Sequence, residues 1–211
     1  MKQYFRYATY IFVLIAFNAA RADPAVDFFR AIMIYNDRTV QALLKEGFDP
    51  NTPNPQGQVG LFLAMRDESV KVARALLAHP AIRIDATNAA NETPLMIASL
   101  KGNIDAAREL LSRGAAVNRS GWSPLHYAAS GPSLPLLELL LQRGADINAT
   151  SPNRTTPLMM AAGYGLQAGA EWLLGKGADA RARNDKGLNA ADFARTADRQ
   201  ELALRIEAVA R

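Results

Sequence analysis

The sequence predicts an all-α solenoid of stacked helix pairs with short β-hairpin-like connections, because three series of residues recur in phase. The related strings TPLMIAS, SPLHYAA and TPLMMAA begin at Thr93, Ser123 and Thr156. Leu-Leu pairs recur at spacings of 33, 34, 30 and 33 residues and end at Leu44, Leu77, Leu111, Leu141 and Leu174. The strings that close the units are KEGFDPN at 45–51, RGAAVN at 113–118, RGADIN at 143–148 and KGADAR at 176–181. Series that stay in step over so many units predict a tandem array.

Each unit is expected to form two short helices. Thr or Ser before Pro favours a helix start, because the hydroxyl caps free amides and Pro has no N–H to lose in the first turn. The second helices are expected to end before a glycine that can adopt a left-handed conformation: Gly47, Gly114, Gly144 and Gly177. One helix pair cannot bury its apolar stripe alone, so the pairs should stack. We expect Leu141 and Leu174 to be buried between units.

From the N-terminus, the units are expected to run as a cap, four repeats and a second cap. The first cap, 25–54, lacks a Thr-Pro start, but it has an apolar face of Phe28, Phe29, Ile32, Val40, Leu43 and Leu44. The repeats are expected at 57–88, 91–118, 121–150 and 154–183. The C-terminal cap, 186–208, has Asn189-Ala190 in place of Thr-Pro, and its expected core residues are Leu202, Leu204 and Ile206. Together they form a single predicted domain over residues 23–211.

These motifs resemble the ankyrin repeat, whose period and T-P-L-H-x-A signature they share. The resemblance covers nearly all of residues 25–208, and the chain is similar to exported bacterial ankyrin-repeat proteins. It implies an ankyrin-repeat solenoid that binds a protein through its concave face and hairpin tips. It also implies that His126, in the Ser-Pro-Leu-His frame, forms a hydrogen bond between adjacent repeats.

Two departures from the repeat pattern fall in the connecting loops. Only Arg119 and Ser120 separate Asn118 from Gly121, three residues fewer than in the neighbouring connection, which predicts a shortened hairpin. Arg154 stands where other units have a glycine, which predicts backbone strain or an altered turn.

Residues 1–22 have the layout of a cleavable secretory signal peptide. Basic residues come first, an uncharged run extends from Tyr7 to Ala20, and Ala20 and Ala22 offer small side chains to a peptidase. As a helix the 14-residue run would measure about 21 Å, short of the roughly 30 Å hydrocarbon core of a bilayer. We therefore expect a cut after Ala22, a protein in the periplasm or secreted, and no membrane association after cleavage. The alternatives are an uncleaved anchor and a simple amphipathic leader.

Composition and charge narrow the possible functions. The absence of cysteine excludes disulfides, thiolate metal sites and a cysteine nucleophile, and the two histidines, His79 and His126, lack metal-site spacing. Without the leader, 21 basic residues face 20 acidic ones, so nothing in the net charge favours nucleic acid as a partner. The sequence has no Walker-type loop, G-x-S-x-G or H-E-x-x-H motif. We expect no catalytic residues, no metal and no cofactor.

The candidate site is therefore a protein-binding surface. In the ankyrin family the hairpin tips and the exposed side of the first helices usually contact partners, and the matching positions here are Gln58, Arg66, Asp67, Glu92, Leu100, Lys101, Trp122, Tyr164, Lys186 and Leu188. Trp122 and Tyr164 stand out, because neither the helix start nor the buried stripe requires an aromatic there. They are either anchors for a partner or local core resting on a neighbouring repeat.

The functional hypothesis is a non-enzymatic, exported binding protein, a monomer, that recognises an unidentified protein in the periplasm of a Gram-negative bacterium. One alternative is a secreted effector that acts on a host protein. A less favoured alternative is an enzyme with an atypical site in the groove.

Overall fold

The computed structural model describes residues 23–211, so the predicted leader and its cleavage motif lie outside the described residues. The described chain contains twelve helices, and its only bridge of the β type is the isolated pair Pro53–Val59. The helices are α2 (Pro24–Met33), α3 (Asp37–Lys45), α4 (Gly60–Arg66), α5 (Val70–Leu77), α6 (Pro94–Lys101), α7 (Ile104–Ser112), α8 (Pro124–Ser130), α9 (Leu134–Gln142), α10 (Pro157–Gly163), α11 (Gln167–Gly175), α12 (Ala190–Thr196) and α13 (Gln200–Ala210).

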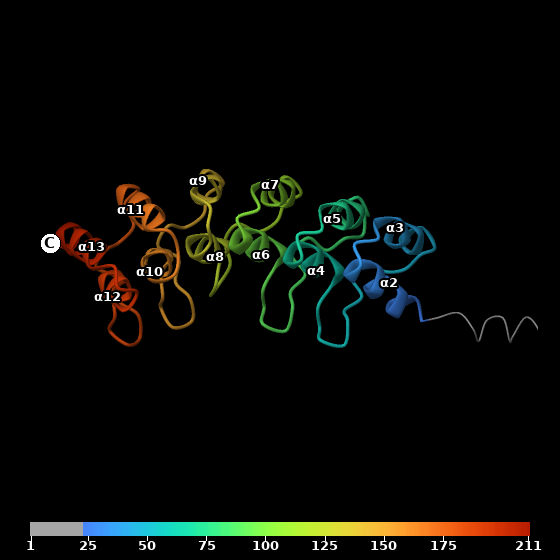
Figure 1. The fold of residues 1–211 in the computed structure, drawn as a ribbon, viewed down its shortest axis with the longest axis horizontal. Coiled ribbons are helices and arrows are strands. Elements are labelled where there is room, and N and C mark those ends of the chain that lie inside the picture. The colour runs from blue at the N-terminus through green and yellow to red at the C-terminus, as the bar shows by residue number, and fades with distance from the viewer. Residues whose placement is uncertain (1–22) are drawn as a thin grey trace, which may run out of the picture.

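The helices form six pairs that stack side by side into an elongated solenoid (Figure 1). The first helices of the pairs form one row: α2, α4, α6, α8, α10 and α12. The second helices form the other row: α3, α5, α7, α9, α11 and α13. The loops between pairs project from the row of first helices (Figure 1). The predicted all-α solenoid of stacked helix pairs is confirmed.

Helix starts and ends follow the local sequence. Thr93 Oγ1 accepts the Met96 N–H at 3.3 Å, and Thr156 caps Met159 at the same distance. Past the second helices, Gly114 and Gly144 have φ angles of 87° and 84°, the left-handed region that glycine enters without a Cβ clash. Arg154 takes a φ of 61°, so the turn there is left-handed with a side chain that disfavours it.

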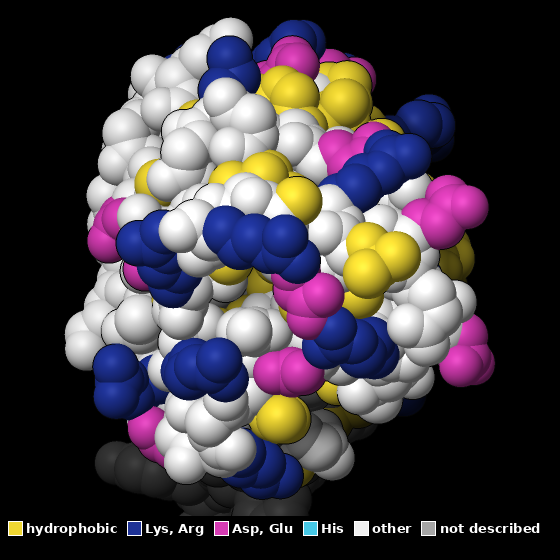
Figure 2. All heavy atoms as spheres, turned by 90° about the vertical axis from the view of Figure 1, so that its left-hand side faces the viewer, with side chains coloured by type: hydrophobic (Ala, Val, Ile, Leu, Met, Phe, Trp, Pro, Cys, Tyr) yellow, Lys and Arg dark blue, Asp and Glu magenta, His cyan; other side chains and the backbone are white. Residues whose placement is uncertain are grey.

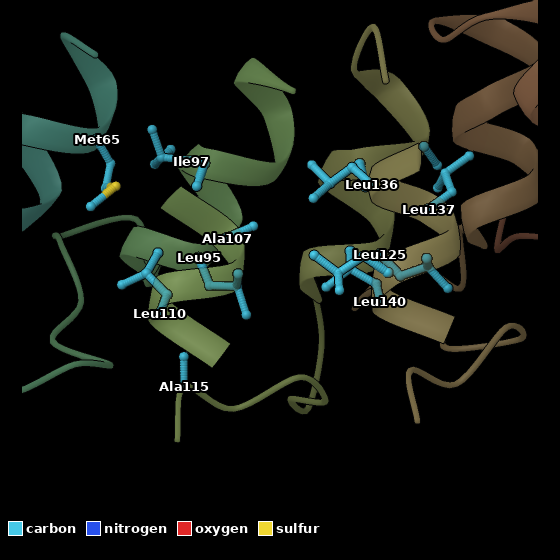
Figure 3. Close-up of a cluster of buried hydrophobic side chains, with 14 of the residues drawn as sticks. Met65, Leu95, Ile97, Ala107, Leu110, Ala115, Leu125, Leu136, Leu137 and Leu140 are labelled. Atoms are coloured by element: carbon cyan, nitrogen blue, oxygen red, sulfur yellow. The ribbon is translucent and has the colours of Figure 1, made fainter. Parts of the chain in front are cut away.

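The core is a continuous row of aliphatic side chains between successive pairs (Figure 3). Leu140 of α9 and Leu173 of α11 are fully buried, whereas Leu141 and Leu174 are only half-buried. Leu141 and Leu174 are therefore not buried as expected; they are partly buried and pack against the core. The buried residues of α9 are Leu136, Leu137, Leu139 and Leu140, so burial along this helix ends one residue before Leu141.

The two ends of the stack carry their own core residues. Phe28, Ile32, Val40 and Leu44 are buried in the first pair, and Phe29 and Leu43 are half-buried. In the last pair Leu202 and Ile206 are fully buried, but Leu204 is 64% exposed, against expectation. On α13, positions 202 and 206 lie one turn apart on the same face, and position 204 points the opposite way.

The C-terminal end of the stack has a mixed polar and apolar outer surface. Figure 2 shows basic, acidic and apolar side chains intermixed on this end. Arg195 pairs with Asp192 and Glu207, and Arg205 pairs with Glu171 of the preceding helix pair. These ion pairs tie α13 to its neighbours.

Between residues 23 and 211, no helix combines the length and the apolar character that a membrane crossing requires.

Candidate protein-binding surface

Asparagine side chains hold three of the five projecting loops, those before α4, α6 and α12, in tight turns. Before α6, Asn88 Oδ1 accepts the N–H groups of Ala90 and Glu92 at 3.0 and 2.9 Å. Asn54 and Asn184 form the same pair of bonds before α4 and α12. The sequence analysis missed these asparagines, although Asn54 and Asn88 are 34 residues apart, in phase with the repeat. Tips fixed in this way present their side chains from defined positions.

The loop before α8 is shorter than its neighbours. It comprises residues 113–123, 11 in all, whereas the loops before α10 and α12 comprise 14 residues each, 143–156 and 176–189. Figure 1 shows that it projects less far than the other loops between pairs. Arg119 in this loop reaches across to Asn91 Oδ1 at 3.0 Å. Trp122 lies in this shortened loop, directly before Ser123, the N-cap of α8.

The two aromatic candidates differ in exposure. Trp122 is half-buried, and its ring meets the His126 ring edge-on with centroids 5.3 Å apart. Tyr164 follows α10 directly and is 66% exposed, with its ring 6.4 Å from that of Phe193. Part of the Trp122 ring is therefore packed locally, whereas most of the Tyr164 side chain faces solvent.

Trp122, Met160 and Tyr164 form the common wall of two adjoining hollows. The hollow of about 490 Å³ extends toward α12, and its lining includes Lys186, Leu188 and Phe193. The hollow of about 310 Å³ extends toward α6, and its lining includes Leu100, Tyr127 and Ser130. We call the apolar surface that joins the two hollows the tip-face patch; its residues are Leu100, Trp122, Met160, Tyr164 and Leu188.

His126 lies beneath this patch as a structural residue. Its Nδ1 accepts the Ser123 N–H at 3.2 Å, so its Nε2 carries the proton and donates to the Thr155 carbonyl at 3.0 Å. The predicted hydrogen bond between adjacent repeats is confirmed. The side chain is fully buried, and burial lowers the His126 pKa, opposed by the hydrogen bond to the Thr155 backbone.

Glu92 connects a loop to the first helix of the next pair. Its Oε1 accepts from the Tyr127 hydroxyl at 2.8 Å, and its Oε2 accepts from Asn88 Nδ2 at 2.7 Å. Burial and the Glu92 carboxylate raise the pKa of Tyr127. Glu92 therefore orders the wall of the smaller hollow, whatever contact it makes with a partner.

The structure brings together half of the predicted contact residues. Leu100, Trp122, Tyr164, Lys186 and Leu188 line the two hollows. The other five lie outside them: Gln58 bonds with Asn54 in the first tip, Arg66 pairs with Asp67, Glu92 accepts from Tyr127, and Lys101 pairs with Glu68.

Met160, Tyr127 and Phe193 also line the two hollows, although they were not among the predicted contact residues. Each lies in a first helix, where an apolar residue is expected to be core. Their positions in the repeat pattern therefore predicted core residues and did not indicate that these side chains would line a hollow.

The described residues provide no arrangement suited to metal chemistry. Within 23–211 no group of three or more His, Cys, Asp or Glu side chains could hold a metal ion. His126 is occupied by Ser123 and Thr155, and His79 Nδ1 accepts the Ala81 N–H in another repeat. What the tip face offers is apolar contact area with a polar rim.

The chain stacks pairs of helices, and the loops between the pairs project in one row. This architecture is that of a helical repeat solenoid. The family model described as ankyrin repeats (3 copies) matches residues 28–120, 83–151 and 116–184. The chain belongs to the ankyrin-repeat family, whose repeats are protein-interaction modules.

Curated relatives carry similar repeats within longer chains. The chain is 32% identical over 152 residues to the mouse B-cell lymphoma 3 protein homolog, a match that covers 69% of this chain and 34% of the mouse protein. It is 30% identical over 161 residues to the chicken nuclear factor NF-kappa-B p105 subunit, covering 73% of this chain and 16% of that protein. A fruit-fly relative, the neurogenic locus Notch protein, is 32% identical over 117 residues, which cover 54% of this chain and 4% of the Notch chain. The chain thus spans about a third or less of each of these relatives.

Proposed function

We propose that this chain is a non-enzymatic binding protein that recognises a protein partner through the tip-face patch. The observation that carries the proposal is the gathering of exposed apolar side chains around two adjoining hollows: Tyr164 is 66% exposed, Leu188 39% and Leu100 38%. Large apolar side chains at a shaped surface supply much of the binding energy in protein interfaces. The chain is proposed to act as a monomer.

The polar rim supports a protein partner rather than a purely apolar ligand. Lys186 lines the ~490 Å³ hollow together with the amide side chains of Asn153 and Asn184. An apolar centre with a polar rim is the usual anatomy of a protein interface.

We further propose that the protein works outside the cytoplasm of a bacterium, in the periplasm. The support is the leader sequence, with its basic start, its apolar run too short for a span, and its small residues before Asp23. A secreted effector that acts on a host protein would use the same surface. Fractionation of cells that express a tagged chain separates the two: we expect the protein in the periplasmic fraction, and recovery in the culture medium or host cell would favour the effector.

Position-specific photo-crosslinking tests the binding proposal. A photoreactive amino acid is placed at Tyr164 and, as the matched control, at Gln142, an exposed residue at the end of the second helix α9. Irradiation of living cells is expected to give a discrete adduct from position 164 that Leu188→Ala weakens. Adducts from position 142 that equal or exceed those from 164 would contradict the assignment of the binding face.

A further inference from the structure

A further hollow lies on the opposite side of the stack, between α3 and α5. Figure 1 shows these two helices next to each other in the row of second helices, away from the projecting tips. The hollow measures about 770 Å³. Nearly buried Leu44 and Ala75 line its base, and four cationic side chains line its walls. We call this surface the basic groove; its cations are Arg38, Lys45, Lys71 and Arg74.

The four cations have no electrostatic partner within the described part of the chain. All four are exposed, and none forms an ion pair or side-chain hydrogen bond there. Elsewhere in the stack six arginines do pair with Asp or Glu: Arg30, Arg66, Arg108, Arg113, Arg195 and Arg205. Asp37, in the first turn of α3, is the single carboxylate that lines the groove. The groove therefore concentrates positive charge in a chain that is almost neutral outside its leader.

Folding does not explain this concentration of charge. Like charges such as Lys71 and Arg74, three residues apart on one helix, destabilise it. His79 also lines the groove, and its Nδ1 accepts the Ala81 N–H at 3.3 Å. Among the side chains that line the groove, Asp37 alone carries a negative charge, against four cations.

The spacing of the cations fits an extended chain of carboxylates. Arg38 and Lys45 lie seven residues apart on α3, about 10.5 Å along the helix axis. An extended peptide advances about 3.3 Å per residue, so about three residues cover that distance, and carboxylates on alternate residues, which share one face, lie about 6.6 Å apart. The apolar base of Leu44 and Ala75 accommodates an apolar side chain between the acids.

Other occupants fit less well. Residues 1–22 of this chain contain three basic side chains and no acid, so the charge of the groove would repel them. A compact phosphate would meet cations spread over two helical turns, and Asp37 occupies the α3 N-terminus where an anion would otherwise be favoured. A lipid bilayer presents a flat surface, so it would contact the rims of the basic groove and would not reach the apolar side chains at its base. A nucleic acid requires a longer basic track than four cations.

We infer that the basic groove between α3 and α5 is a second docking site, and that it takes a carboxylate-rich segment of a partner protein. The site is independent of the tip-face patch, because the two lie on different rows of helices.

Fluorescence anisotropy with a defined peptide tests this inference. The probe is a short rhodamine-labelled peptide in which Glu alternates with Ser on both sides of a central Leu, and the control peptide has Gln for every Glu. At low salt the full chain is expected to bind the Glu peptide at least about tenfold more tightly than the Gln peptide, with the difference shrinking as salt rises. Equal affinity for the two peptides would overturn the inference.

Matched charge reversals locate the binding. Arg38→Glu combined with Lys71→Glu is expected to weaken Glu-peptide binding about tenfold or more, whereas Arg83→Glu combined with Arg143→Glu, the same change at exposed arginines outside the groove, changes it less than about twofold. Lys45→Gln combined with Arg74→Gln repeats the test if the first variant does not fold. Equal losses in groove and control variants would overturn the site. Stronger competition for the groove by phosphatidylserine vesicles or single-stranded DNA than by unlabelled Glu peptide would overturn the peptide assignment.

Discussion

Replacing Leu140 by Ala is expected to destabilise the stack far more than the same change at its neighbour Leu141. Leu140 is fully buried, whereas Leu141 is half-buried at the edge of the second-helix row. Shortening a buried leucine to alanine loses roughly 2.4 kcal/mol of transfer free energy at about 0.8 kcal/mol per methylene. The cavity that remains raises the loss in the free energy of unfolding to about 3–4 kcal/mol. Leu141 loses about half of the transfer part and leaves no enclosed cavity, so about 1 kcal/mol is expected.

Urea unfolding followed by circular dichroism measures both variants. With a slope of about 2 kcal/mol per molar urea, the midpoint should fall by about 1.5–2 M for Leu140→Ala and about 0.5 M for Leu141→Ala. The adjacent pair is its own control for helix propensity, since both residues lie in α9. Equal losses, or a larger loss for Leu141→Ala, would refute the assignment of the buried face.

Three further predictions follow from the leader and the site. Sequencing of the exported protein should give Asp23 as its N-terminus; intact Met1 in the membrane fraction would contradict cleavage. The lowered His126 pKa means that the unfolded chain takes up a proton at a higher pH than the folded chain, so stability should fall as the pH drops below about 6.5. This loss of stability at low pH should be smaller in His126→Gln. Identical profiles of stability against pH for the variant and wild type would contradict the role of His126. Because Trp122 packs on His126, Trp122→Ala should lower both partner affinity and melting temperature; a lower melting temperature with full affinity would make the ring purely structural.

Most of the fold could be predicted because it is specified locally. The Thr-Pro starts, the left-handed glycines and the short loop after Asn118 each depend on residues close together in sequence. The side of a short helix that becomes buried is set by the neighbouring pair instead. With helices of seven to nine residues, the apolar pattern alone did not separate Leu140 from Leu141.

The candidate surfaces could be predicted only in part. Trp122 and Tyr164 were found because they depart from the repeat pattern, whereas Met160 agrees with it and gave no signal. The basic groove combines Arg38 of one unit with Lys71 of the next. Along the sequence each resembles an ordinary solvated charge, and only the stacking of α3 beside α5 brings them together.

The most direct test of the central claim is the affinity of the captured partner for Tyr164→Ala, measured beside wild type and the Gln142→Ala control. Tyr164 is 66% exposed, so its removal should leave the melting temperature unchanged. We predict a loss of about 1–3 kcal/mol in binding free energy, roughly a tenfold or greater rise in Kd, with no change for Gln142→Ala. An unchanged Kd for Tyr164→Ala would contradict the claim that the tip-face patch binds the partner.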